Sequence, residues 1–152
     1  MTRGIPGPAA TVRTMTVEAA ISEAFSDLEE LANEMREWAD NLEEHFSGQE
    51  KTERVAEVAD TLENLSAPDI DAALADISVT ITDLKRRSRP YSRADRRSQA
   101  VYVIETCIQA LNEFRDDESI SEEIAAKADD LSGELENAKD EADMLDFPGM
   151  YG

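Results

Sequence analysis

The segment Thr16–Phe46 reads TVEAAISEAFSDLEELANEMREWADNLEEHF. Its apolar residues recur in alternating steps of four and three, at Val17, Ile21, Ala24, Leu28, Leu31, Met35, Trp38 and Leu42. This heptad spacing places them on one face of a helix that packs against other helices. Thr16 is a suitable N-cap, and Ser47 and Gly48 are typical of a helix end. The segment therefore predicts a long amphipathic helix that needs partners to cover its apolar face.

Four further segments carry the same spacing and predict the partner helices, over residues 50–65, 69–87, 92–114 and 119–145. Pro90, which cannot continue a helix, separates the segments 50–65 and 69–87 from the segments 92–114 and 119–145. Within the second of these segments, Ile77–Thr82 also alternates like a strand and is rich in β-branched residues. We expect a helix there, because the four-three spacing continues on both sides and no second strand is evident.

Short connections between these helices predict an all-α fold, an antiparallel bundle of about five helices with heptad-type packing. The expected bundle covers residues 16–145. Residues 1–15 contain Gly4, Pro6, Gly7 and Pro8, which predicts an extended N-terminal arm, and residues 146–152 predict an extended C-terminal tail. Since apolar faces can also be shared between chains, a homo-oligomer is an open alternative.

Charge is the strongest feature of the composition. The 152 residues include 35 acidic and 15 basic side chains, for a net charge of −20. Three explanations are open: solubility alone, a salt-rich environment, or an acidic surface that binds a basic partner. Direct binding of duplex DNA by such a surface is not expected, because phosphates would be repelled. There is one cysteine, Cys107, and no apolar run of membrane-spanning length, so we expect an intracellular protein without a disulfide.

Six carboxylates form an acidic stripe one position before the apolar residues of the first predicted helix. They are Glu23, Asp27, Glu30, Glu34, Glu37 and Glu44. At a rise of about 1.5 Å per residue, the stripe is about 32 Å long. Its spacing of one charge per about 5 Å is comparable to that of phosphates along a DNA strand, about 3.4 Å. Such a stripe could imitate DNA and occupy a basic groove, or it could be an ordinary solvated face.

A basic segment lies between the third and fourth predicted helices. It contains Lys85, Arg86, Arg87, Arg89, Arg93, Arg96 and Arg97. One interpretation is a patch for phosphate or for an acidic partner, with Tyr91 available for stacking. The other is that these side chains complement a helix dipole and pair with the acidic faces of the protein itself. A molecule with separate acidic and basic regions could also associate with copies of itself.

The spacing Glu34-x-x-Glu37 followed by Glu57-x-x-Asp60 resembles the metal-binding pattern of the MazG-like all-α nucleoside triphosphate pyrophosphohydrolases. The resemblance implies that these four carboxylates hold Mg²⁺ in a hydrolase. Outside this alternative we expect no cofactor and no catalytic site. His45, Trp38 and Cys107 are expected to have packing or helix-end roles.

The turn Ser92-Arg93-Ala94-Asp95-Arg96-Arg97, followed by an apolar helix in a small acidic chain, resembles uncharacterised helical proteins of tailed phages. This resemblance favours a non-enzymatic interaction module of the DNA-mimic or inhibitor type, which would bind a basic partner in the host cytoplasm. The alternative is a structural or assembly protein of the virion, docked through its arms and basic segment. Neither role involves a membrane.

Overall fold

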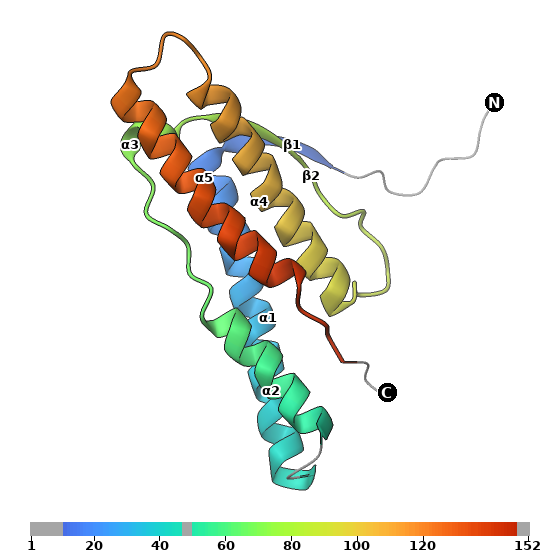
Figure 1. The fold of residues 1–152 in the computed structure, drawn as a ribbon. Coiled ribbons are helices and arrows are strands. Elements are labelled where there is room, and N and C mark those ends of the chain that lie inside the picture. Colours follow the sequence, from blue (N-terminus) through green and yellow to red (C-terminus); the bar gives the residue numbers. More distant parts are fainter. Residues whose placement is uncertain (1–10, 47–49, 149–152) are drawn as a thin grey trace, which may run out of the picture.

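The computed structural model describes residues 11–46 and 50–148, and it is mostly helical (Figure 1). Its long helices are α1 (Val17–Phe46), α2 (Glu50–Glu63), α4 (Arg93–Arg115) and α5 (Glu122–Asp143). Between α2 and α4 lie the short helix α3 (Ala72–Ala75) and the strand β2 (Ser78–Thr82). Strand β1 (Val12–Thr16) leads directly into α1.

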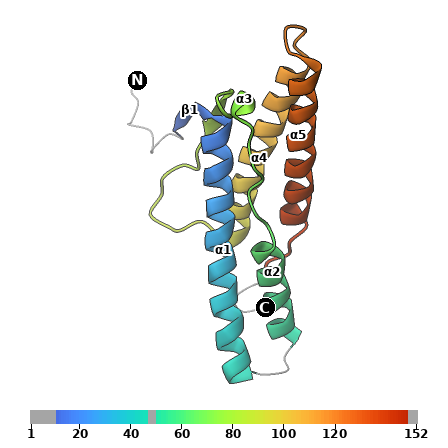
Figure 2. The same ribbon diagram turned by 90° about the vertical axis from the view of Figure 1, so that its left-hand side faces the viewer.

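Helix α1 is the spine of the molecule, as its uninterrupted apolar spacing predicts. Helix α4 packs along its N-terminal part, α5 packs antiparallel against α4, and α2 packs along the C-terminal part of α1 (Figure 2). Helices α5 and α2 therefore lie one above the other, with their neighbouring ends in contact. A long segment connects α2 to α3 and runs beside the helices.

The core follows the predicted apolar positions. From Val17 to Met35, each predicted residue of α1 is at most 1% exposed. The partner helices contribute the buried residues Val55, Val58, Leu62, Val101, Ile104, Ile108, Leu111, Ala128, Leu131 and Leu135. Towards the end of α1, Trp38 and Leu42 are only partly buried, because α2 alone covers that part of the helix.

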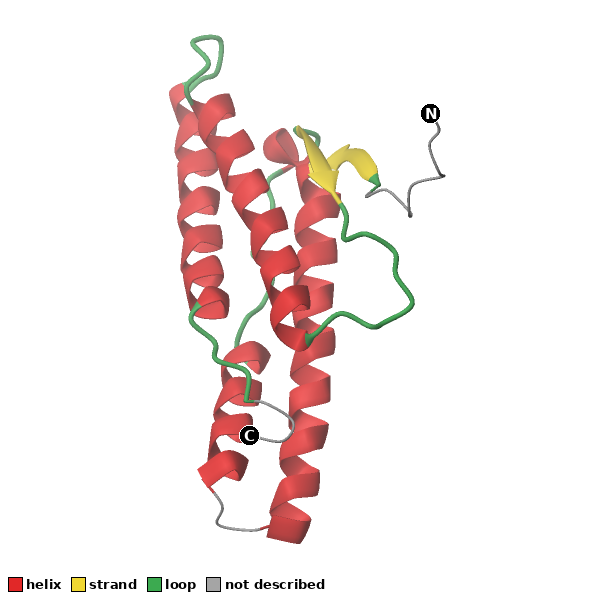
Figure 3. Ribbon diagram, turned by 90° about the vertical axis from the view of Figure 1, so that its right-hand side faces the viewer, coloured by secondary structure: helices red, strands yellow, loops and turns green. Residues whose placement is uncertain are grey.

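The predicted helix over residues 69–87 is wrong. Only Ala72–Ala75 is helical, and Ser78–Thr82 forms β2, which pairs antiparallel with β1 in the register Val12↔Thr82 and Arg13↔Ile81 (Figure 3). The alternation of Ile77–Thr82 is thus the alternation of a strand. The missing second strand was Val12–Thr16, which the sequence placed in the arm.

The small sheet buries one face. Val79 and Ile81 are at most 4% exposed and Met15 packs against the core, whereas Thr14, Ser78, Thr80 and Thr82 are exposed on the other face. The predicted N-terminal arm is therefore corrected: its described end is a strand of the fold. The remainder of that arm, residues 1–10, lies outside the described residues, as do residues 149–152 of the predicted tail.

Both ends of the α4–α5 pair have defined caps. The Ser92 hydroxyl accepts a hydrogen bond from the Asp95 N–H at the start of α4. Helix α5 starts at Glu122 rather than at Ser119, because its N-cap is Ser121, whose hydroxyl accepts from the Ile124 N–H. At the other end of α5, the Arg97 guanidinium of α4 donates to the carbonyl oxygens of Ala142 and Leu145, at 2.9 and 2.7 Å.

Candidate functional site

Two carboxylates in the N-terminal half of the acidic stripe, Glu23 and Glu34, are paired inside the molecule, while Glu30 between them is exposed. Glu23 accepts from Arg13 of β1 at 2.7 Å. Glu34 receives Arg96 through both carboxylate oxygens, at 3.0 and 2.5 Å, and also Arg93 at 3.2 Å. Since Arg93 and Arg96 belong to the basic segment, the two predicted charged features neutralise one another where α4 begins.

Asp27 lies between these two ion pairs and is half-buried. It lines a small hollow of about 120 Å³ together with Glu30, Leu84, Arg96 and Gln99. Burial raises the pKa of Asp27, and the neighbouring carboxylates of Glu23 and Glu30 raise it further. By contrast, the hydrogen bonds from Arg96 lower the pKa of Glu34. The stripe is therefore not a uniform row of solvated charges.

The C-terminal part of the stripe is free. Glu37 and Glu44 are exposed, and their side chains have no ion pair or hydrogen bond within the described part of the chain. Asp40, which was not predicted as a site residue, lies between them, is equally exposed and has no such partner in the same ranges. The spacing of three and four residues places these side chains on one side of α1. We call Glu37, Asp40 and Glu44 the acidic edge.

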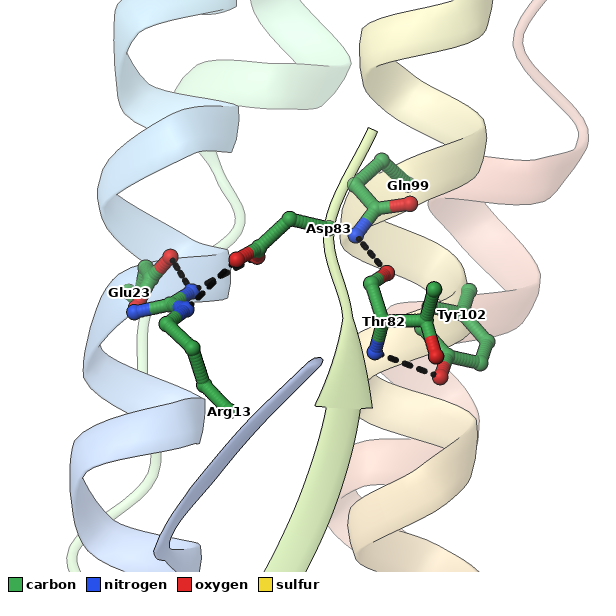
Figure 4. A network of polar contacts seen from close by, with 6 residues as sticks. All are labelled: Arg13, Glu23, Thr82, Asp83, Gln99 and Tyr102. Carbon is green, nitrogen blue, oxygen red and sulfur yellow. Dashed lines mark hydrogen bonds and ion pairs between the residues drawn. The ribbon is translucent and has the colours of Figure 1, made fainter. Parts of the chain in front are cut away.

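A second network fixes the sheet to the helices (Figure 4). The Arg13 guanidinium donates to both oxygens of Asp83, at 2.6 and 2.8 Å, in addition to its bond with Glu23. On the far side of β2, the Thr82 N–H donates to the Tyr102 hydroxyl, and the Thr82 carbonyl accepts from the Gln99 amide, both at 3.0 Å. This network positions the start of the loop that carries the basic segment.

The basic segment divides into two parts at Ser92. Arg93, Arg96 and Arg97 are partly buried and face their own molecule, where Arg93 also lies 5.1 Å from the centre of the Trp38 ring. The part before Ser92 is exposed, and we call it the basic loop, with the four cations Lys85, Arg86, Arg87 and Arg89. It connects β2 to α4 and curves away from the helices (Figures 2 and 3).

Tyr91 organises the basic loop from within. Its hydroxyl donates to the Lys85 carbonyl oxygen at 2.6 Å, and the Arg87 guanidinium lies 3.6 Å from the centre of its ring. Arg87 also donates to the carbonyl oxygens of Arg89 and Pro90. Arg87 therefore occupies one face of the Tyr91 ring, which the sequence suggested as a stacking surface.

The four carboxylates of the MazG-like pattern are not brought together. Glu34 is held by Arg96, and Asp60 is paired with Arg36, which also binds Glu63 at 2.8 Å. Glu37 and Glu57 are exposed. Among the described residues there is no group of three or more His, Cys, Asp or Glu side chains placed to hold a metal ion.

Other candidate chemistry is structural. Cys107 is fully buried, and burial raises its pKa to about 12, so its thiol is not a nucleophile at neutral pH. A hollow of about 750 Å³ lies between α1 and residues 62–70, lined by side chains such as Phe25, Leu62 and Ile70. Neither histidine nor cysteine lines it.

Sequence reasoning missed the residues that organise these surfaces, namely Arg13, Asp83, Asp40 and Gln99. No local signal marks them, since their roles depend on which elements meet in space. No helix in the described ranges has the length and apolarity needed to cross a membrane. Comparisons with family models, with curated proteins and with solved structures gave no match.

Proposed function

We propose that this protein is a non-enzymatic interaction module that binds a basic protein surface through the acidic edge of α1. The observation that carries the proposal is the contrast within one helix. In the first half of the acidic stripe Glu23 and Glu34 are paired with Arg13, Arg93 and Arg96, whereas the acidic edge is exposed and has no partner among the described residues.

The acidic edge has the properties of a recognition surface for cations. It spans seven residues, or roughly 10 Å at 1.5 Å per residue. The nearest arginine, Arg36, is already engaged by Asp60 and Glu63 of α2. A basic groove of a nucleic-acid-binding protein would fit such an edge, which is the DNA-mimic or inhibitor role, and the partner would lie in the host cytoplasm if the protein is phage-encoded.

The test is capture of binding partners from host lysate with elution in steps of salt. Contacts between exposed charges weaken as salt screens them, so the bound partner should be released as NaCl rises from ~0.1 to ~0.5 M. Charge reversal by Glu37→Arg with Glu44→Arg should weaken binding about tenfold or more. Glu34 is unsuitable for this purpose, because its loss would also break the contact between α1 and α4.

The matched control reverses two exposed acids elsewhere, Glu134→Arg with Glu141→Arg on α5. It changes the net charge by the same amount and should leave binding intact. Equal loss of binding in the two double variants would refute a specific role for the acidic edge.

A second candidate function is a structural or assembly role in a virion. The exposed cations of the basic loop favour it, since they provide a docking surface separate from the acidic edge. Under this alternative, partner binding should depend on Arg86 and Arg89 and should be insensitive to Glu37 and Glu44. The same captures, repeated with variants of the basic loop, separate the two candidates.

A further inference from the structure

Three cations of the basic loop have no partner among the residues that the structure describes. Lys85, Arg86 and Arg89 are exposed, and their side chains make no ion pair, hydrogen bond or ring contact within the described ranges. Every other lysine and arginine of those ranges makes at least one such contact. The lysines and arginines of the described ranges that lack a partner thus all lie within five consecutive residues of a chain with 35 acidic residues.

The basic loop is held in place before any partner arrives. The hydrogen bond from the Tyr91 hydroxyl to the Lys85 carbonyl oxygen closes the loop at its base. Within the loop, the Arg87 guanidinium donates to the carbonyl oxygens of Arg89 and Pro90. A surface that is ordered in advance loses less conformational entropy on binding. The three unpaired cations are therefore presented by a loop with a defined shape.

The same stretch of chain already recognises α1 within the molecule. Arg93 and Arg96, which follow the loop, bind Glu34 of α1. The acidic edge continues the same helix over the next turns, with unpaired carboxylates at Glu37 and Glu44. The loop curves away from α1 in its own molecule, so that its cations and this edge remain apart (Figures 2 and 3).

We propose that the basic loop of one copy docks on the acidic edge of a second copy, so that the protein associates with itself head to tail. The inference rests on the proposed function and names its partner: the basic surface bound by the acidic edge is the basic loop. Three cations, Lys85, Arg86 and Arg89, face three carboxylates, Glu37, Asp40 and Glu44. The contact joins two unlike surfaces and is therefore heterologous.

The net charge of −20 sets the conditions for this contact. At low salt the copies repel one another at long range. At physiological ionic strength the Debye length is about 8 Å, which removes most of this repulsion, while ion pairs at contact distance are screened less. Association is expected at intermediate salt, with less at both extremes. Carboxylates are favoured over single-stranded nucleic acid as the anion, because the chain itself presents exposed carboxylates at Glu37, Asp40 and Glu44 and Arg87 already occupies one face of the Tyr91 ring.

Sedimentation equilibrium of the full chain at ~0.15 M NaCl tests the proposal. The wild-type protein should associate with increasing concentration. The loop variant, Arg86→Glu with Arg89→Glu, and the edge variant, Glu37→Arg with Glu44→Arg, should each associate about tenfold or more weakly. An equimolar mixture of the two variants should associate again, because the intact edge of the loop variant can bind the intact loop of the edge variant, and the two reversed surfaces also match.

The Glu134→Arg with Glu141→Arg protein has the same net charge as the edge variant and should associate like the wild type. A wild-type protein that stays monomeric up to roughly 1 mM, or a loop variant that associates normally, overturns the proposal. Binding of single-stranded DNA that is lost in the loop variant, without self-association, overturns it in favour of nucleic acid.

A separate titration with a synthetic arginine-rich peptide distinguishes failure of this inference from failure of the proposed function. The peptide should bind the wild-type protein and the loop variant equally, and the edge variant more weakly. If the peptide binds in this way while the wild-type protein stays monomeric, the acidic edge recognises cations but not those of a second copy. If the peptide does not distinguish the edge variant, the proposed function itself fails.

Discussion

At the scale of single residues, arginines decide where the helices meet. Arg13 joins β1 to Asp83 and Glu23, Arg36 joins α1 to α2, and Arg96 joins α4 to α1. A guanidinium can bind two carboxylate oxygens at once, which fixes geometry as well as charge. In a chain of such negative charge, these few cations connect acidic helices that would otherwise repel one another.

Arg97 has a different role, because its acceptors are backbone carbonyls at the end of α5. The substitution Arg97→Ala should lower the free energy of unfolding by about 2 kcal/mol, since it leaves these oxygens without their charged donor. Urea denaturation followed by circular dichroism measures the change. Arg54→Ala, which removes only a long and exposed contact with Asp146, should have a much smaller effect. Similar losses in both variants would contradict this role of Arg97.

Glu34 and Asp27 should have opposite effects on stability as pH changes. The pKa of Glu34 is lowered in the folded protein, so its stabilising contribution is present above the ordinary value of 4.5 and is lost as pH falls through the lowered pKa. Glu34→Gln should therefore destabilise the protein by about 1 to 2 kcal/mol at pH 7 and have little effect once the pH is below the lowered pKa of Glu34.

The pKa of Asp27 is raised by burial, so its ionised form is unfavourable in the folded protein. Asp27→Asn should stabilise the protein at pH 7, and this gain should shrink as pH falls through the raised pKa. Urea unfolding of both variants and the wild type over a pH series checks the two signs. A stabilising Glu34→Gln at pH 7 would contradict its pairing with Arg96, and a destabilising Asp27→Asn would contradict the cost of burying the Asp27 carboxylate.

At the scale of elements, the register of the sheet decides which backbone N–H and C=O groups of each strand face the other strand. The Asp83 N–H donates to the Thr11 carbonyl, and the Val17 N–H donates to the Ile77 carbonyl. Since the pattern alternates along a strand, the N–H of Met15 faces β2 and that of Thr14 faces away from it. Proline, which lacks this N–H, should be tolerated at Thr14 but not at Met15.

Thr14→Pro should consequently change the free energy of unfolding little, whereas Met15→Pro should destabilise the protein by about 1 to 3 kcal/mol more than Met15→Ala. The alanine variant accounts for the lost side chain. Thermal and urea denaturation provide the comparison. Equal effects of proline at the two positions would mean that the register Thr14↔Thr80 is not the one adopted.

The sequence was sufficient to predict α1, α2, α4 and α5, because their apolar spacing is long and repeated. It was insufficient for the sheet, since β1 and β2 are five residues each and lie more than sixty residues apart. A short strand is stable only when it is paired, and the spacing of apolar residues within one segment does not show which distant segment is its partner. The residues of the charged surfaces were predicted in the same way as the long helices, by spacing. Their pairing was left open because it depends on how α4 and β1 are placed against α1.

At the scale of the whole molecule, repulsion among the many negative charges destabilises the compact folded state. The described acids cover α1, α2 and α5 on several sides, and few cations separate them. Self-repulsion of this kind destabilises the folded state, and salt relieves it. A salt-rich environment, one of the explanations for the composition, would suit such a protein.

The thermal unfolding midpoint should accordingly rise by several degrees as NaCl increases from ~0.05 to ~0.5 M. Differential scanning fluorimetry at constant pH measures the shift. The Glu134→Arg with Glu141→Arg protein, with a smaller net charge, should show a smaller rise. A midpoint that falls with salt would indicate that the internal ion pairs outweigh the repulsion.

The shared spine also has a consequence for how the molecule opens. The N-terminal part of α1 packs against α4 and the small sheet, whereas its C-terminal part packs mainly against α2 (Figure 2). Backbone amides of α1 around Leu28 and Leu31 should therefore exchange hydrogen for deuterium only in rare global openings, and those around Leu42 in frequent local ones. One continuous helix would then report two opening free energies, with the acidic edge in the part that opens first.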